Sequence, residues 1–390
     1  MRNRNGFRLR EVLIVACMIF AGIAAFLPDS VNSIALYGAI PFAFVLSLFD
    51  KSRYKNESFK LFVVLSVWLL CTVLWAMDTD AAFRQMRQVL GCLLVSYVVG
   101  KNAYKDNMLP WLYVVWLALY VSAIYYANTH IVQDIEFGEE RLNDEKLNAN
   151  MLAYHTFYST VVIYVLGEIL QSSFWRKFFR VLLVGMVYIS FFVAIATASR
   201  QVLIVQIPLF AFILYIRYML HVSVIPRIVF VLLISVIGIV GFEYFSELYD
   251  NSLLKQRGEM DIEDDSRIIL IGDAFKVGMD NFFHGVGAGN YQIVSYGHKF
   301  SHNTFLELFA NTGIVGVLIY VGMLILYLKK QIGYYRVTGD KLFLLFFVFG
   351  VIYCVDNVFY VFYNSQWLVA FFILVSSHSD AYFGKRYRIG

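Results

Sequence analysis

Apolar residues fill most of the chain in runs of about twenty, and short polar segments separate these runs. A helix of that length matches the hydrocarbon core of a bilayer, which is about 30 Å thick. The pattern therefore predicts an all-α integral membrane protein with about twelve transmembrane helices. The predicted spans are residues 11–27, 31–49, 58–76, 88–100, 108–127, 150–170, 177–198, 201–217, 226–243, 302–328, 341–357 and 362–377.

One long polar stretch interrupts this pattern between the ninth and tenth predicted spans, at residues 244–302. It predicts a large extramembrane loop with short amphipathic helices. The chain is accordingly divided into residues 1–243 with nine spans, the loop at 244–302, and residues 303–390 with three spans and a tail. Polar residues gather at Ser266–Gly316, so we expect the function to lie there.

Composition excludes a soluble domain. The 390 residues are 60% hydrophobic and only 15% charged, and the mean hydropathy is +0.65. The basic N-terminus and the apolar run after it resemble a signal peptide. No small-residue cleavage site precedes Pro28, so the run is interpreted as the first helix. The cysteines fall in or at the ends of predicted spans and indicate neither disulfides nor a metal site; they are Cys17, Cys71, Cys92 and Cys354.

The distribution of charge predicts the orientation. With both termini in the cytoplasm, the inner segments hold most of the 32 Lys and Arg residues, and the outer segments hold most of the 28 acidic residues. This is the positive-inside pattern, and it places the loop at 244–302 on the outer side of the membrane. It also accounts for the net charge of +4 without a nucleic-acid partner.

Arg200 is unusual in this arrangement. Residues 181–216 form an apolar run of 36 residues, which as one helix would be about 54 Å long, too long for a single span. The only polar position for a turn is Ser199-Arg200-Gln201, so Arg200 is predicted at the outer face. There it either reaches toward lipid phosphates or serves as a fixed cation for an anionic ligand.

Arg267 is a second predicted outer cation, in the first turn of a surface helix that follows Asp264-Asp265. It either pairs with one of these acids or has a functional role. The sequence HGVGAGNY comes next and differs from a dinucleotide-binding motif in spacing and context. We interpret its glycines as a flexible turn, with phosphate contact through backbone N–H groups as the alternative.

His302 precedes a predicted helix in which Asn303, Glu307 and Asn311 recur four residues apart and form one polar stripe. Polar groups at membrane depth usually face a cavity or the bundle interior. A neutral histidine there could accept a proton from a sugar hydroxyl, or it could simply cap the loop. Spacing does not separate His302 from His298. No acid or cysteine lies at ligand spacing from His302, so no metal is expected.

These segments, in this order, resemble the O-antigen ligase and O-antigen polymerase superfamily. The resemblance rests on Thr197-x-Ser199-Arg200, Ser266-Arg267, the glycine turn, His302-Asn303-x-x-Leu306-Glu307, Thr312-Gly313-Ile314-Val315-Gly316, Arg141-Leu142 with Asn148-x-Asn150, and Arg84. It extends over roughly residues 80–330, and Gln201 departs from the small residue that many relatives carry after the arginine.

The resemblance implies a glycosyltransferase that takes a glycan from undecaprenyl diphosphate at the periplasmic face, without a metal or cofactor and with inversion. It implies Arg200 and Arg267 on the diphosphate, which suits the fixed fork of arginine, and His302 as the base or orienting partner for the acceptor hydroxyl. Further substrate-binding candidates are Arg84, Arg141, Asn303 and Glu307. The expected partners are the lipid-linked glycan, an acceptor glycan or lipid A–core, membrane lipids and a chain-length regulator.

Polymerase and ligase differ in the acceptor. The compact tract between Arg267 and His302 favours a polymerase of O-antigen, capsule or exopolysaccharide repeat units, with an O-antigen ligase as the alternative. A lipid-linked oligosaccharide flippase is the alternative of another class. The absence of an internal repeat in the sequence, and the clustering of candidate residues at one face, argue against a transporter.

Overall fold

The computed structural model describes residues 8–130, 149–197, 200–219, 222–229 and 266–387, together with residues 232 and 236. These residues are helical with short connections, and no strand occurs among them. Six of the helical segments are long and apolar enough to cross a membrane. They are Asp29–Leu48, Glu57–Trp75, Leu109–Thr129, Ser173–Ala194, Thr304–Thr338 and Lys341–Phe359.

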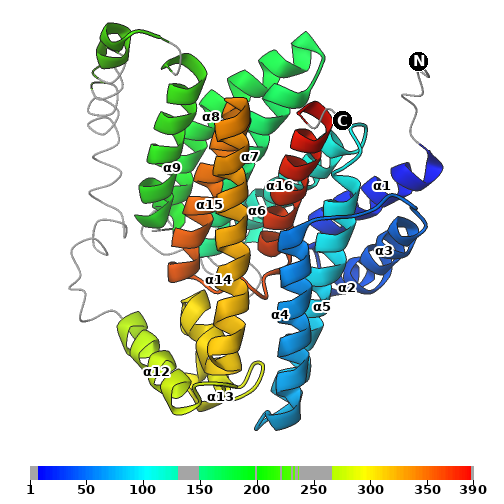
Figure 1. Cartoon of the computed structure of the whole chain (residues 1–390), viewed down its shortest axis with the longest axis vertical. Coiled ribbons are helices and arrows are strands. Elements are labelled where there is room, and N and C mark those ends of the chain that lie inside the picture. The colour runs from blue at the N-terminus through cyan, green and yellow to red at the C-terminus, as the bar shows by residue number, and fades with distance from the viewer. Residues whose placement is uncertain are drawn as a thin grey trace. The chain divides into compact units, whose positions relative to one another are not determined.

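The chain divides into two compact units (Figure 1). Unit 1 comprises residues 1–18, 36–112 and 261–390, and unit 2 comprises residues 19–35 and 113–260. In unit 1 the helices are α3 (Ile40–Leu48), α4 (Glu57–Thr72), α5 (Thr79–Asn102), α12 (Ser266–Asp280), α13 (Tyr291–Val294), α14 (Thr304–Thr338), α15 (Lys341–Phe359) and α16 (Gln366–Arg386). Short 3₁₀ turns lie at Val73–Trp75 and Tyr296–His298, and a π-helical turn at Ala35–Ala39 precedes α3.

Unit 2 holds α2 (Asp29–Ile34), α7 (Ala149–Ile169), α8 (Ser173–Thr197), α9 (Arg200–Leu214) with a π-helical turn at Tyr215–Met219, and most of α6 (Leu109–His130). Helix α1 (Leu9–Ala24) contributes its first half to unit 1 and its second half to unit 2. Helices α8 and α9 pack against each other and α9 also packs on α7, which confirms that the long apolar run at 181–216 forms two helices. Residues 198–199 between them lie outside the described residues.

Eleven of the twelve predicted spans overlap one of these helices, and most of the predicted span at 226–243 lies outside the described residues. The largest difference is α5, which begins at Thr79, whereas the sequence predicted a span at residues 88–100. Its first turns are polar and were not recognised as helix. Asp78 caps them, because its carboxylate accepts from the Ala81 amide at 2.9 Å. The count of twelve spans stays a prediction.

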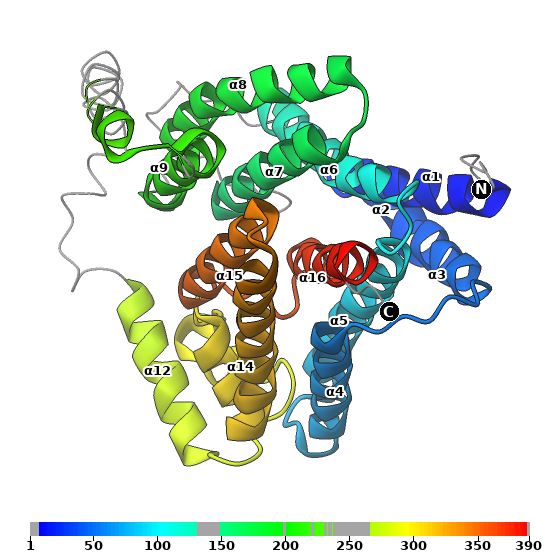
Figure 2. The same ribbon diagram turned by 45° about the horizontal axis from the view of Figure 1, so that its top comes forward.

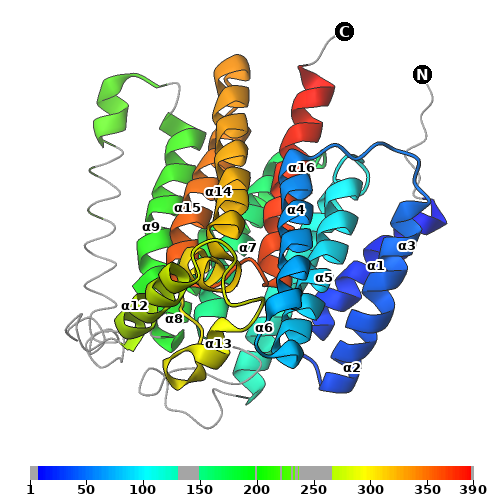
Figure 3. The ribbon, with the colours of Figure 1, turned by 60° about the horizontal axis from the view of Figure 1, so that its bottom comes forward.

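Within unit 1, α4 runs beside α14, α16 runs beside α5, and α12 packs on the first half of α14 (Figures 2 and 3). The last turn of α4, the start of α5 and Thr312 of α14 lie together at one end of the unit, beside α12 and α13. The segment between α15 and α16 contacts the start of α14 and Gln85 of α5. This end is called the His302 end below. It brings the predicted polar segments together.

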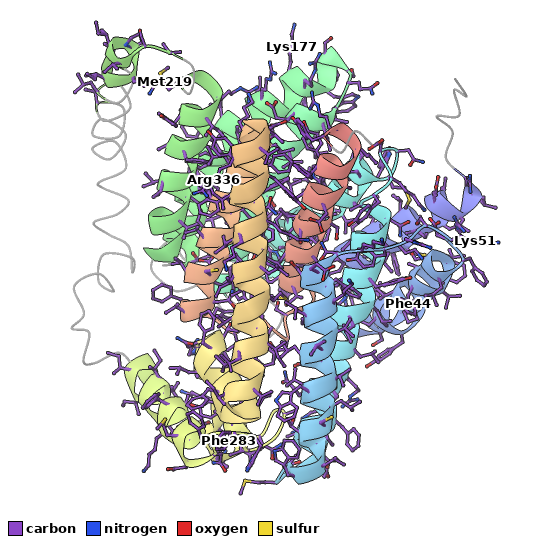
Figure 4. All side chains as sticks on the ribbon, viewed as in Figure 1. Phe44, Lys51, Lys177, Met219, Phe283 and Arg336 are labelled. Atoms are coloured by element: carbon purple, nitrogen blue, oxygen red, sulfur yellow. The ribbon has the colours of Figure 1, made fainter. Side chains whose placement is uncertain are left out.

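Basic side chains gather at the opposite end of unit 1, and they form ion pairs there. Lys105 pairs with Asp50, and Lys330 pairs with Asp380 at 3.1 Å. Burial raises the pKa of Asp50, but hydrogen bonds from Lys105 and from the Ser52 amide outweigh this effect and hold the pKa well below its usual range. Figure 4 places Arg336 toward this end and Phe283 at the His302 end. The arrangement agrees with the charge bias from which the orientation was predicted.

Candidate active site

His302 lies immediately before α14. Asn303 is the N-cap of this helix, and its side-chain oxygen accepts from the amides of Phe305 and Leu306, both at 3.0 Å. The imidazole is partly exposed, and its ring centre lies 4.3 Å from that of Phe300. His302 has a backbone φ of 57°, an uncommon value for a residue with a side chain. The capped start of α14 and an aromatic ring thus define its place.

His298 has a different environment. It ends the 3₁₀ turn Tyr296–His298, its side chain is exposed, and its Nδ1 lies 3.3 Å from the Gln292 carbonyl oxygen. Its φ of 54° is also positive, so backbone conformation does not distinguish the two histidines. Only His302 is partly enclosed and fixed at the start of α14.

The predicted polar stripe on α14 exists, and all three of its members are buried. Glu307 accepts from the Ser301 amide at 2.7 Å. Asn311 accepts from the Tyr291 amide at 2.8 Å and donates to the Tyr363 hydroxyl at 3.3 Å. Hydrogen bonds from the stripe thus hold the loop that precedes the helix. Substrate contact by Asn303 and Glu307 stays a prediction, and their hydrogen bonds indicate that they position the loop that carries His302.

Helix α14 is interrupted at Gly313, whose φ is 67° and ψ −170°. The interruption exposes backbone groups, and the glycine turn binds them. Val286 donates its amide to the Ala310 carbonyl at 2.8 Å, and Gly287 donates to the Asn311 carbonyl at 3.0 Å. In the other direction, the Ile314 amide donates to the Phe282 carbonyl at 2.8 Å. Helix α14 therefore begins as a short segment held by the turn.

The three glycines of the turn have positive φ and are tightly packed. A Cβ on Gly285 would lie 2.3 Å from the Asn311 backbone, and one on Gly287 would lie 2.6 Å from the Ala76 backbone. The amides of Gly285, Val286, Gly287 and Ala288 already donate within the protein. The turn was predicted to be flexible, with phosphate contact as the alternative. These occupied amides instead give it a structural role, because it connects α14 to α4 and α5.

Two contacts connect the turn to its neighbours. The buried side chain of Asn290 accepts from the Asp78 amide at 2.6 Å and donates to the Asp78 carbonyl at 3.1 Å. Trp68 of α4 donates its indole N–H to the Thr312 carbonyl at 3.0 Å, beside the kink. The start of α5, which carries Arg84, is thereby fixed to the same loop as the start of α14.

Arg84 lies on the exposed side of α5, near its N-terminus. The segment between α15 and α16, residues 360–365, approaches both α5 and α14. Thr304 donates its hydroxyl to the Tyr360 carbonyl at 2.7 Å, and Asn364 lies 3.3 Å from the side-chain oxygen of Gln85. Sequence analysis missed this segment, because an unremarkable connection between two apolar runs carries no motif. The one available signal was the pair of amides Asn364, at its end, and Gln366, the first residue of α16.

The two principal arginines occupy the positions that the sequence predicted within their helices. Arg200 is the first residue of α9 in unit 2, and Arg267 is the second residue of α12 in unit 1. The structure describes their backbones alone, and Arg141 lies outside the described residues. The proximity of Arg200 and Arg267 to a common ligand therefore stays a prediction.

Helix α12 does form where an amphipathic surface helix was predicted. It packs through Ala274, which joins Tyr291 and Ala310 in a small buried core, and the Tyr291 hydroxyl donates to the Leu270 carbonyl at 2.9 Å. The apolar side chains of Ile268 and Phe275 on this helix are exposed. Among the residues that the structure describes, no group of three His, Cys, Asp or Glu side chains could hold a metal ion.

Helical segments of membrane-spanning length and a polar end assembled from several segments define a multi-pass membrane protein with one candidate site. Comparison with known families gives a specific match: the model of the O-antigen ligase family matches residues 181–321. This match supports placing the chain in the O-antigen ligase and polymerase superfamily. It covers Arg200, Arg267 and His302, whereas Arg84 and Arg141 lie outside it. No curated protein matches the sequence.

Proposed function

We propose that the protein transfers an oligosaccharide from undecaprenyl diphosphate to a hydroxyl group of an acceptor, at the periplasmic face of the inner membrane. The observation that carries the proposal is the position of His302. It lies at the start of α14, partly exposed, within the segment that the O-antigen ligase family matches. The match supports a glycosyltransferase-like activity in O-antigen processing.

The reaction needs one base and one stabilised leaving group. The acceptor oxygen attacks the anomeric carbon, His302 takes the hydroxyl proton, and the bond from the anomeric carbon to the diphosphate oxygen breaks. The electron pair of that bond leaves with undecaprenyl diphosphate. Attack from the opposite face inverts the anomeric carbon. Arg200 and Arg267 stabilise the charge that develops on the diphosphate, because a guanidinium binds phosphate oxygens through two parallel hydrogen bonds.

Replacing Arg267 with alanine is expected to lower the transfer rate about 10- to 100-fold, because a hydrogen bond to a charged group contributes about 1.5–3 kcal/mol. Arg200→Ala is expected to have an effect of similar size. The measurement is transfer of a labelled glycan from undecaprenyl diphosphate by purified protein in lipid nanodiscs. Lys276→Ala is the matched control, since Lys276 is an exposed cation on the same helix. Unchanged rates in both arginine variants would remove these residues from the site.

We propose a polymerase, because the tract from Arg267 to His302 is short and is occupied by α12, the glycine turn and α13. A ligase is the second candidate, because the matching family model is described as O-antigen ligase. The two functions use the same donor. A polymerase extends a lipid-linked repeat unit, whereas a ligase attaches the finished chain to lipid A–core.

Deletion of the gene separates the two candidates. Loss of a polymerase is expected to leave lipid A–core that carries a single repeat unit. Loss of a ligase is expected to leave bare core and to accumulate lipid-linked polymer. The measurement is gel electrophoresis of lipopolysaccharide together with mass spectrometry of the lipid-linked glycans. Bare core with lipid-linked single repeat units, rather than polymer, trapped on the cytoplasmic side would support the flippase alternative instead.

A further inference from the structure

A cluster of four carboxamide side chains lies at the His302 end of unit 1, outside the residues so far assigned to the reaction. Gln85 and Gln88 come from the first half of α5, and Asn364 and Gln366 come from the segment that leads into α16. Asn364 donates to the side-chain oxygens of Gln85 and Gln88, at 3.3 Å and 3.4 Å. These four residues are called the amide cluster. It joins two segments that are almost 280 positions apart in the sequence.

Two buried donors of the cluster lack an acceptor within the described part of the chain. The Nε2 atoms of Gln85 and Gln366 are buried, and neither has a hydrogen-bond partner among the residues that the structure describes. Gln85 is 8% exposed as a whole side chain. The two bonds from Asn364 are longer than the usual 2.7–3.2 Å for an N–H donor and an oxygen acceptor. A buried N–H donor without an acceptor raises the free energy of the folded protein. Several such donors close together therefore usually indicate that a hydrogen-bond partner is missing.

The surroundings of the cluster fit a polar ligand. Arg84 and Arg87 are exposed on the same side of α5 as Gln88, since residues three and four apart share a helix face. Gly91 continues this face one turn further on. A Cβ at Gly91 would lie 2.9 Å from the side-chain oxygen of Gln366, so the glycine leaves room for that carboxamide.

The cluster is tied to the start of α14 by the segment that contains Asn364. The Phe362 amide donates to the Thr304 hydroxyl at 2.9 Å, and Tyr363 receives a hydrogen bond from Asn311. Thr304 follows His302 by two positions. The amide cluster is therefore held against the same helix end that carries the proposed base.

We infer that the amide cluster binds hydroxyl groups of the glycan, beside the sugar that reacts. This inference rests on the proposed function and deepens it. A carboxamide offers donors and an acceptor together, and a sugar hydroxyl also donates and accepts, so the two groups match. The hydroxyl oxygens supply the acceptors that Gln85 and Gln366 lack. Arg84 and Arg87 lie at the border of the cluster, so the hydrogen bonds at its centre are made by uncharged groups.

The test compares Gln85→Leu and Gln366→Leu, singly and together, with the wild-type protein in nanodiscs. Three probes are used: undecaprenyl diphosphate without a glycan, the repeat-unit oligosaccharide released from its lipid, and core oligosaccharide. Binding is measured by native mass spectrometry and by isothermal titration calorimetry. Gln331→Leu is the matched control, because Gln331 is also a buried glutamine with an unpartnered Nε2 but lies near the other end of α14.

The double variant is expected to bind one of the two free oligosaccharides about tenfold more weakly, while undecaprenyl diphosphate binds all variants equally. Weakening for the repeat unit assigns the cluster to the lipid-linked glycan, and weakening for core oligosaccharide assigns it to a ligase acceptor. Equal binding of both oligosaccharides by the double variant and by wild type overturns the inference and leaves the proposed function standing. A wild-type protein that binds none of the probes overturns the proposed function itself.

Discussion

Replacing His302 with asparagine is expected to lower glycan transfer about 10²–10⁴-fold, which is the usual contribution of a positioned general base. The variant keeps a side chain that tolerates the backbone φ of 57° at this position, because asparagine adopts left-handed conformations more readily than most residues. It also preserves the Asn303 cap, which relies on a different side chain. The fold should therefore survive, and the loss should appear in the rate of transfer.

The structure offers a matched control for this experiment. His298 has nearly the same backbone φ, 54°, and lies four residues earlier in the same loop. Its side chain is exposed, whereas that of His302 lies against Phe300. His298→Asn therefore makes the same chemical and conformational change outside the enclosed position. It is expected to transfer glycan at a rate within about threefold of wild type, as surface substitutions usually change little.

The dependence on pH provides a second readout. A histidine base works in its neutral form, so transfer should fall at acidic pH, where the imidazole becomes protonated. The His302→Asn variant should lose this acidic limb, because no imidazole remains to be protonated. If His298→Asn abolishes transfer and His302→Asn does not, the assignment of the two histidines is reversed. Full activity in both variants would exclude a histidine base from this loop.

Much of the helical architecture could be predicted from the sequence, because a membrane-spanning helix is encoded locally. An apolar run of about twenty residues is itself the signal, and helices such as α4 and α15 follow their runs closely. The first half of α5 was missed for the same reason. It is polar and amphipathic, and contacts with a loop about 200 positions away hold it in place. The clearest of these contacts is the hydrogen bond from the Asp78 amide to the Asn290 side chain.

The candidate site could be predicted only in part. The stripe of Asn303, Glu307 and Asn311 was recognised, since residues four apart share a helix face whatever the surrounding fold. Its partners were not recognisable, because Ser301, Tyr291 and Tyr363 show no pattern that relates them to α14. The glycine turn was interpreted as flexible. Glycine is suited to flexible loops and to tightly packed ones alike, and only the packing around it distinguishes the two cases.

The contacts connect the candidate residues of unit 1 through a single element. The glycine turn holds the first half of α14 through the Ala310 and Asn311 carbonyls, and it holds the start of α5 through Asn290. His302 precedes the first of these helices, and Arg84 lies on the second. A change in the turn should therefore affect both the proposed base and the proposed glycan contacts. Adding one methyl group within the turn should therefore have a large structural consequence.

Gly285→Ala and Gly313→Ala are each expected to destabilise the protein by about 3 kcal/mol or more and to abolish transfer. Both residues have positive φ, 68° and 67°, which costs about 1–2 kcal/mol with a side chain present. Both new methyl groups would also collide with backbone. A Cβ on Gly313 would lie 2.3 Å from the Phe283 backbone, as close as one on Gly285 would lie to Asn311. Backbone atoms cannot move away from the new methyl group as the atoms of a flexible side chain can.

Gly297→Ala separates strain from collision, since Gly297 has a φ of 66° and no atom within 4 Å of the position of a Cβ. In this variant only the positive φ is unfavourable, so it is expected to lower the stability by about 1–2 kcal/mol and to retain transfer. Thermal unfolding followed by intrinsic fluorescence measures the stability of all three variants in the same nanodiscs. If Gly285→Ala and Gly313→Ala unfold at the same temperature as Gly297→Ala, the turn does not clamp α14. A lower midpoint for both, together with lost transfer, would show that the turn holds His302 in place through the kink.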